Sequence, residues 1–215
     1  MKLNLGESHP NVATCQSNLA LAYQILREYD KSIKLLESAL ESDLRNFGST
    51  HPRVAVRQSN LGLVYKDLKE FDKASELPES ALSSTLKTFG PNHPKVAMSQ
   101  TNLAMLYKDL GKPEEASNLL ESALSSASES FGDNHIDVAK VKANLAMVYN
   151  DLKKFERAYI LILSAFFIYH RQFGEKHPGT RAMIRNMRSI NKEWERAESG
   201  ACKRFMKWLK NNQPS

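Results

Sequence analysis

The chain has 215 residues, and its contents of 41% hydrophobic and 25% charged residues are those of an ordinary folded, soluble protein. Two cysteines, Cys15 and Cys202, are too few for a disulfide framework or a cysteine-rich metal site, which favours a reducing, cytoplasmic compartment. The net charge of +6 is local: residues 1–178 carry 21 basic and 21 acidic residues, whereas residues 179–215 carry 9 and 3.

Residues 1–5 precede the repeats as a short leader. They lack the apolar core of a signal peptide. The longest nearly apolar run, Ala158 to Tyr169, is shorter than the roughly 20 residues that a membrane-spanning helix needs. We therefore expect neither a secretion signal nor a transmembrane segment.

From residue 6 the sequence repeats itself with a period of 42 residues. Residues 42 positions apart form a column, and whole columns keep one residue type. The glycine column is Gly6, Gly48, Gly90, Gly132 and Gly174, and the histidine column is His9, His51, His93, His135 and His177. The period predicts four full repeats (6–47, 48–89, 90–131 and 132–173), the first helix of a degenerate fifth (174–198) and a terminal segment (199–215).

Each repeat is predicted to hold two antiparallel helices. The first begins at the His-Pro step, because proline suits the first position of a helix. The second runs from about Asp30 to Phe47 in repeat 1 and ends at Gly48, since glycine readily takes a positive φ. Small residues in both helices, such as Ala20 and Ser32, mark where the two approach closely. One pair cannot bury its apolar face alone, so the pairs should stack into a solenoid.

The motif Leu61-Gly62-x-x-Tyr65 and its equivalents resemble the signature of tetratricopeptide (TPR) repeats. The 42-residue period with Phe-Gly-x-x-His-Pro-x-Val-Ala is similar to the repeats of kinesin light chains and their bacterial relatives. The resemblance covers about residues 5–190. It implies an all-α fold, a right-handed superhelical solenoid of antiparallel helix pairs.

The resemblance also implies that the asparagine column faces the concave groove, where amides would hold the backbone of a partner peptide. Alternatively, these amides only tie neighbouring repeats together. Helical spacing adds the residues one before, three after and six after each asparagine. The predicted groove residues are Asn18, Asn60, Asn102 and Asn144; Ser17, Ser59, Thr101 and Ala143; Leu21, Leu63, Met105 and Met147; and Gln24, Lys66, Lys108 and Asn150.

The histidine column does not predict a metal site. One histidine per repeat lies on successive layers roughly 10 Å apart, whereas zinc needs its ligands at about 2 Å from one point. We expect these histidines to begin helices. No catalytic or phosphate-binding signature occurs, so we predict no enzymatic activity and no cofactor. The Lys66-Asp67 and Lys108-Asp109 pairs are interpreted as solvated surface.

Pro78 interrupts repeat 2. It stands in a column of buried leucine or isoleucine, in the middle of a predicted second helix. Proline there removes a backbone donor and clashes with the preceding turn, at about 3 kcal/mol or more. Two interpretations stay open: a bend that changes the curvature of the groove, or a local defect that the array tolerates.

Repeat 4 differs on one face of its second helix. Ile160, Leu163 and Phe167 replace polar residues of the earlier repeats, and an apolar face should be covered. The terminal segment holds an amphipathic basic helix with Cys202, Phe205, Met206, Trp208 and Leu209. We predict that this helix caps repeat 4; a dimer or partner surface is the alternative, and a membrane a third.

The sequence therefore predicts a non-catalytic scaffold that binds a protein or peptide in its groove, without metal. A homodimer through the C-terminal repeat is a further possibility. The rival hypothesis is that the basic tail, Arg181 to Lys210, binds nucleic acid or an anionic membrane. A third is that the chain is the sensor or regulatory segment of a larger signalling protein.

Overall fold

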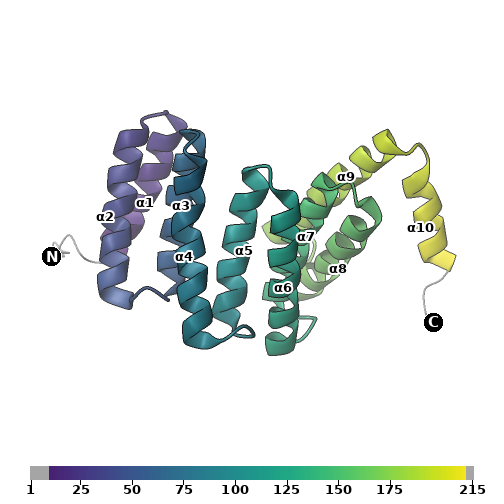
Figure 1. Cartoon of the computed structure of the whole chain (residues 1–215). Helices are drawn as coiled ribbons and strands as arrows, with labels where there is room; N and C mark the ends of the chain where they lie inside the picture. Colours follow the sequence, from purple (N-terminus) through teal and green to yellow (C-terminus); the bar gives the residue numbers. More distant parts are fainter. Residues whose placement is uncertain (1–9, 212–215) are drawn as a thin grey trace. The chain divides into compact units, whose positions relative to one another are not determined.

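The computed structural model describes residues 10–211, and the side chains of residues 11–200 and 202–207. Helices make up this part of the chain, and no strand occurs in it (Figure 1). The helices are α1 (Pro10–Ile25), α2 (Tyr29–Phe47), α3 (Pro52–Asp67), α4 (Phe71–Phe89), α5 (Pro94–Asp109), α6 (Pro113–Phe131), α7 (Ile136–Asp151), α8 (Phe155–Phe173), α9 (Pro178–Ala197) and α10 (Ala201–Asn211).

The chain forms two compact units, residues 1–112 with α1 to α5 and residues 113–215 with α6 to α10. Within each unit, helices that follow one another in sequence pack together, as in the antiparallel pairs α1–α2, α3–α4 and α7–α8. The prediction of an all-α fold built from antiparallel helix pairs is confirmed. None of the helices in the described part combines the length and apolar content required to cross a membrane.

Histidines begin the first helices from repeat 2 onward. The Nδ1 atom of each accepts a hydrogen bond from the backbone N–H two residues on, over 3.1–3.2 Å, which satisfies a donor that the helix leaves unpaired. Each imidazole also stacks on the phenylalanine that ends the preceding second helix, with ring centres 4.4–4.6 Å apart. The residues concerned are His51, His93, His135 and His177. Their predicted role at the helix start is confirmed.

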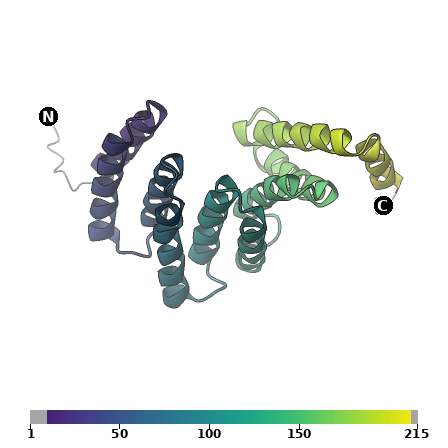
Figure 2. The ribbon, with the colours of Figure 1, turned by 45° about the horizontal axis from the view of Figure 1, so that its top comes forward.

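Each turn between a first and a second helix needs one residue with a positive φ. Arg27, Lys69 and Lys153 take φ values of 58–64°, and Gly111 takes 75° in the same column. In repeat 2 this closes the helix, because the backbone N–H of Glu70 donates to the Tyr65 carbonyl over 2.9 Å. Repeat 5 has no such turn: Glu195 occupies that column and α9 continues to Ala197. Figure 2 shows α10 leaving the far end of this longer helix.

The contact between the second helix of one repeat and the first helix of the next is called a junction here. At the first junction Arg57 Nε donates to Asp43 Oδ2 over 3.0 Å, and both side chains are buried. At the second, Ser99 Oγ lies 3.5 Å from Thr85 Oγ1. The same two columns hold buried Ala127 and Val141 at the third junction and buried Tyr169 and Met183 at the fourth. At the four junctions these two columns thus hold ionic, hydroxyl, aliphatic and then aromatic and thioether side chains.

Pro78 does not break α4, which is helical from Phe71 to Phe89. Proline cannot donate to the carbonyl of Ala74, four residues earlier, and its ring crowds that oxygen. The same oxygen lies against Gly62 of the partner helix α3, where an added Cβ would be only 2.5 Å away. The other full repeats have alanine in the Gly62 column and leucine or isoleucine in the Pro78 column. We infer that Gly62 makes room for the carbonyl that Pro78 leaves without a donor.

Candidate functional site

The asparagine column lies on the first helices. Asn18 is exposed, and Asn60, Asn102 and Asn144 are half-buried. The amide of Asn60 donates to Ser17 Oγ of the preceding repeat over 3.3 Å, as the alternative role of tying repeats together requires. The amide nitrogen of Asn102 is enclosed and has no hydrogen-bond partner in the described part of the chain. The column therefore contains at least one donor that the fold does not use.

The column six residues after each asparagine joins neighbouring first helices. Gln24 donates to Asp67 over 2.7 Å, and Asn150 donates to Glu193 over 2.8 Å. The ammonium of Lys66 lies 3.8 Å from Asp109. These side chains have a connecting role that the sequence analysis did not assign, and Asp67 and Asp109 are partners rather than merely solvated surface. The two residues of each pair lie 43 positions apart in the sequence. A column of donors followed at this spacing by a column of acidic residues could therefore have predicted these contacts.

The apolar groove residues remain partly accessible. Leu21 is 37% exposed, and Leu63, Met105 and Met147 are half-buried. In the first unit, Asn102 and Met105 therefore place an unused amide donor three residues before a half-exposed, flexible thioether side chain. Such a combination of a polar anchor and an adaptable apolar surface suits contact with a peptide.

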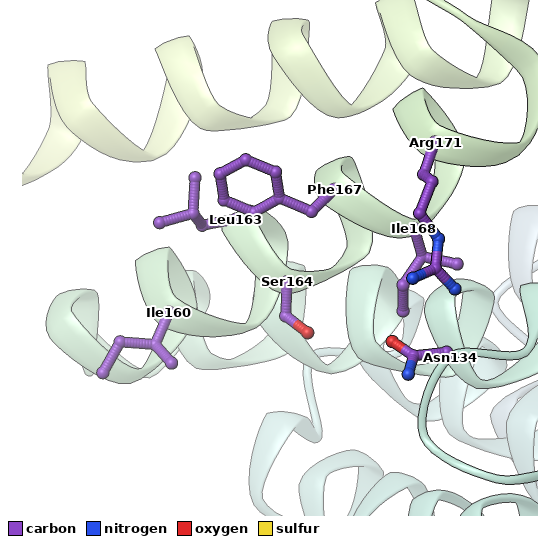
Figure 3. Close-up of a pocket in the computed structure, with 7 residues that line it drawn as sticks. All are labelled: Asn134, Ile160, Leu163, Ser164, Phe167, Ile168 and Arg171. Atoms are coloured by element: carbon purple, nitrogen blue, oxygen red, sulfur yellow. The ribbon is translucent and has the colours of Figure 1, made fainter. Parts of the chain in front are cut away.

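The face of α8 on which Ile160, Leu163 and Phe167 replace the polar residues of earlier repeats is called the switched face here. It is open to solvent. Ile160 is 47% exposed and Phe167 is 59% exposed, whereas Leu163 is half-buried. A cavity of about 390 Å³ runs along this face (Figure 3). In the figure, Leu163 and Phe167 lie together on one side, and Arg171 lies near Asn134. An apolar surface with a cation at its edge is typical of a protein-contact site.

A second cavity, of about 510 Å³, lies between α6 and α8 over α7. Tyr149 lines it and donates its hydroxyl to Glu121 Oε1 over 2.6 Å. Burial, followed by the hydrogen bond to Glu121, raises the pKa of the Tyr149 phenol, which keeps the group a neutral donor. Ile160 lines both cavities and so connects them along α8.

The terminal helix α10 packs against Tyr159 of α8 and leaves Ile160 and Phe167 of the switched face exposed. Its Phe205 ring packs edge-on to Tyr159 at 6.2 Å and lies 5.4 Å from Trp194, while Cys202 Sγ donates to Asn191 Oδ1 over 3.1 Å. Burial raises the pKa of the Cys202 thiol, which remains protonated. The helix is displaced because α9 extends past the usual turn. The side chains of Trp208 and Leu209 lie outside the described residues.

Known structures share this arrangement. The nearly identical TPR-like repeats of a Podosopora anserina protein described as a kinesin light chain are 22% identical over 96% of this chain and 99% of that one, with a TM-score of 0.64. BtubC (BKLC) of P. vanneervenii is 25% identical over 96% of this chain and 84% of that one, with a TM-score of 0.65. The apo form of the quorum sensor NprR from B. thuringiensis is 18% identical over 93% of this chain and 52% of that one, with a TM-score of 0.56.

No curated protein matches the chain in a sequence comparison. The family model described as "Tetratricopeptide repeat" matches residues 11–85, 58–129 and 101–159, which together exceed half of the chain. With the 42-residue period and the capped helix pairs, this match shows that the chain belongs to the tetratricopeptide-repeat family.

Proposed function

We propose that the chain is a non-catalytic scaffold that binds a peptide segment of a partner protein along its first helices. The observation that carries this proposal is the Asn102 amide nitrogen, which is enclosed and lacks a hydrogen-bond partner among the described residues. A buried donor without an acceptor costs about 1–3 kcal/mol. Because the Asn102 side chain as a whole is half-buried, a change of its rotamer would bring the amide to a peptide carbonyl and recover that free energy on binding.

Neighbouring residues support the same surface. Leu63 and Met105 are half-buried beside Asn60 and Asn102, so a peptide held by the amides would also cover apolar side chains. The Ser17 hydroxyl accepts from Asn60, which fixes the orientation of that amide before any peptide arrives. A pre-oriented site loses less entropy on binding than one that must be ordered.

The test is selection of binding peptides from a displayed random library, followed by affinity measurements with variants. Asn102→Asp keeps the size of the side chain and replaces the amide donor with an acceptor. We expect at least about a tenfold loss of affinity, because one hydrogen bond is lost and two acceptors then face each other. The control is Asn118→Ala/Gln172→Ala, which removes two exposed amides from second helices and should leave affinity unchanged.

The switched face of α8 is the competing surface for the same function. Peptides whose binding survives Asn102→Asp but is lost on Phe167→Ser would place the contact on α8 and contradict the groove proposal. Phe167 is 59% exposed, so its replacement should leave the fold intact.

A further inference from the structure

Basic side chains form a straight row along one face of α9. The residues recur at intervals of three or four, which keeps them on one side of a helix. They are Arg181, Arg185, Arg188, Lys192 and Arg196, called the basic row here, and all are exposed. The buried residues of α9, among them Thr180, Met183, Ile190 and Trp194, lie on the opposite side. The row therefore points away from the rest of its unit.

The charge of the basic row is not neutralised within the described part of the chain, where none of its members forms an ion pair. Two acidic residues of α9 have partners elsewhere. Glu193 accepts from Asn150, and Glu195 accepts from the backbone N–H of Gly200, each over 2.8 Å. The +6 net charge of the chain resides in residues 179–215, and the row supplies much of it.

Two members of the row occupy columns that pack the helices of the other repeats together. Arg181 stands in the column of Ala55, Ala97 and Ala139, all of which are buried. Arg188 stands in the column of Ala20, Gly62, Ala104 and Ala146, all of which are buried, and Gly62 lies directly against the second helix of its repeat. A second helix in the regular position would collide with Arg188, which agrees with the displaced α10. The fold does not require these charges for packing.

We propose that the basic row binds the phosphate backbone of a nucleic acid without reading the base sequence. The row spans about 22 Å at 1.5 Å per residue. Its four intervals average about 5.6 Å, which is wider than the 3.4 Å rise per phosphate along one strand of a duplex, so each charge can meet a different phosphate. Four of its five members are arginine, whose planar guanidinium matches phosphate oxygens in pairs.

Other polyanions fit less well. No large apolar side chain of α9 is exposed in the described chain, so this face offers nothing to insert into a lipid bilayer and little for a protein partner to bury. It also lacks an exposed aromatic ring on which unpaired bases could stack. Exposed Lys203, Arg204 and Lys207 on α10 add charge of the same sign.

The experiment measures fluorescence anisotropy of a labelled DNA duplex about 20 base pairs long, which exceeds the length of the row. Five phosphate contacts predict a slope of about −4.5 for log affinity against log salt concentration, or about a 500-fold loss between 50 and 200 mM salt. The test variant is Arg185→Glu/Arg188→Glu/Lys192→Glu. At low salt its affinity should fall by at least about 100-fold, because three contacts become repulsive.

The control variant is Lys34→Glu/Lys69→Glu/Lys87→Glu, which reverses three exposed charges in the first unit and gives the same net charge. Its affinity for the duplex should change by less than about threefold, since distant charges are screened. Circular dichroism melting checks that both variants remain folded. Equal losses in the two variants, or full binding by the test variant, would overturn the proposal. Binding to polyglutamate or to phosphatidylserine-containing vesicles without binding to DNA would overturn it as well.

Discussion

Asp43 and Arg57 form an ion pair that is almost wholly enclosed at the first junction, with side-chain exposures of 0% and 8%. Arg53 Nε approaches the same carboxylate oxygen at 3.9 Å, but it is more exposed. Removal of one partner from a buried pair leaves a charge without compensation, whereas replacement of both can be neutral. The second junction offers a natural neutral pair, Thr85 and Ser99, at the same positions.

We predict that Asp43→Thr and Arg57→Ser each lower the free energy of unfolding by about 3–5 kcal/mol. The double variant, which copies the pair of the second junction, should recover most of that loss. Urea unfolding of the wild type, the two single variants and the double variant measures the coupling free energy between the two side chains. Losses that simply add in the double variant would show that the two side chains do not act as a pair.

At the scale of the helix, Gly62 in α3 compensates for the disturbance that Pro78 causes in α4. Pro78 leaves the Ala74 carbonyl without its helical donor, and Gly62 leaves space for that oxygen. The two substitutions occur together in repeat 2 and in no other full repeat. Pro78 therefore costs less in this repeat than it would opposite an alanine.

We predict that Gly62→Ala lowers the free energy of unfolding by about 1–2 kcal/mol, although alanine is the better helix former. Pro78→Leu should raise the melting temperature, because a donor to Ala74 is restored. In the Pro78→Leu background the loss caused by Gly62→Ala should shrink by about 0.5 kcal/mol or more.

Ala20→Gly, in the same column of repeat 1, serves as the control for this cycle. It should cost about 1 kcal/mol whether or not Pro78 is present. If Gly62→Ala also loses the same free energy in both backgrounds, Gly62 does not compensate for Pro78. Calorimetry of thermal unfolding measures the free energy of unfolding of each variant in both backgrounds.

Most of the helices could be predicted from the sequence, because the period fixes both where they start and where they stop. The second helix of repeat 1 was expected from about Asp30 and begins at Tyr29. The histidine caps agree with the expected helix starts, but their stacking on phenylalanine depends on ring geometry that spacing does not give. The position of α10 could not be predicted by analogy with the second helices of the other repeats. Glu195 stands where those repeats have the turn residue, and α9 continues past it to Ala197.

The candidate site was harder to predict from the sequence than the helices were. The family resemblance indicated the groove columns, but it could not say which of their side chains already form hydrogen bonds or ion pairs within the fold. Gln24, Lys66 and Asn150 have acidic partners one repeat on, whereas Asn102 keeps an unused donor. That distinction depends on the stagger between neighbouring first helices, which only the three-dimensional packing sets.

At the scale of the whole molecule, α10 completes the second unit. Cys202 and Phe205 are buried, and they cover Tyr159, Trp194 and Asn191. Without α10 these aromatic residues would face solvent next to Ile160 and Phe167, which are already exposed on α8. Exposed apolar surface of that extent favours association between copies.

We therefore predict that deletion of residues 200–215 causes dimerisation or aggregation, measured by sedimentation velocity at several concentrations. Phe205→Ala in the full chain should lower the free energy of unfolding by about 3 kcal/mol through loss of the same contacts. Lys203→Ala, on the exposed side of α10, should have neither effect. A truncated chain that remains a stable monomer would contradict the capping role of α10.

The different chemistry of the four junctions has a consequence for assembly errors. Chains built from similar copies misfold readily by docking one copy onto the wrong neighbour, within a chain or between chains. If the first helix of repeat 4 docked onto the second helix of repeat 1, Val141 would meet the Asp43 carboxylate and leave that charge without its arginine. If repeat 2 docked onto repeat 3, Arg57 would meet Ala127. Each mismatch buries an uncompensated charge. The ionic junction therefore disfavours incorrect pairing of repeats and specifies that repeat 2 packs on repeat 1.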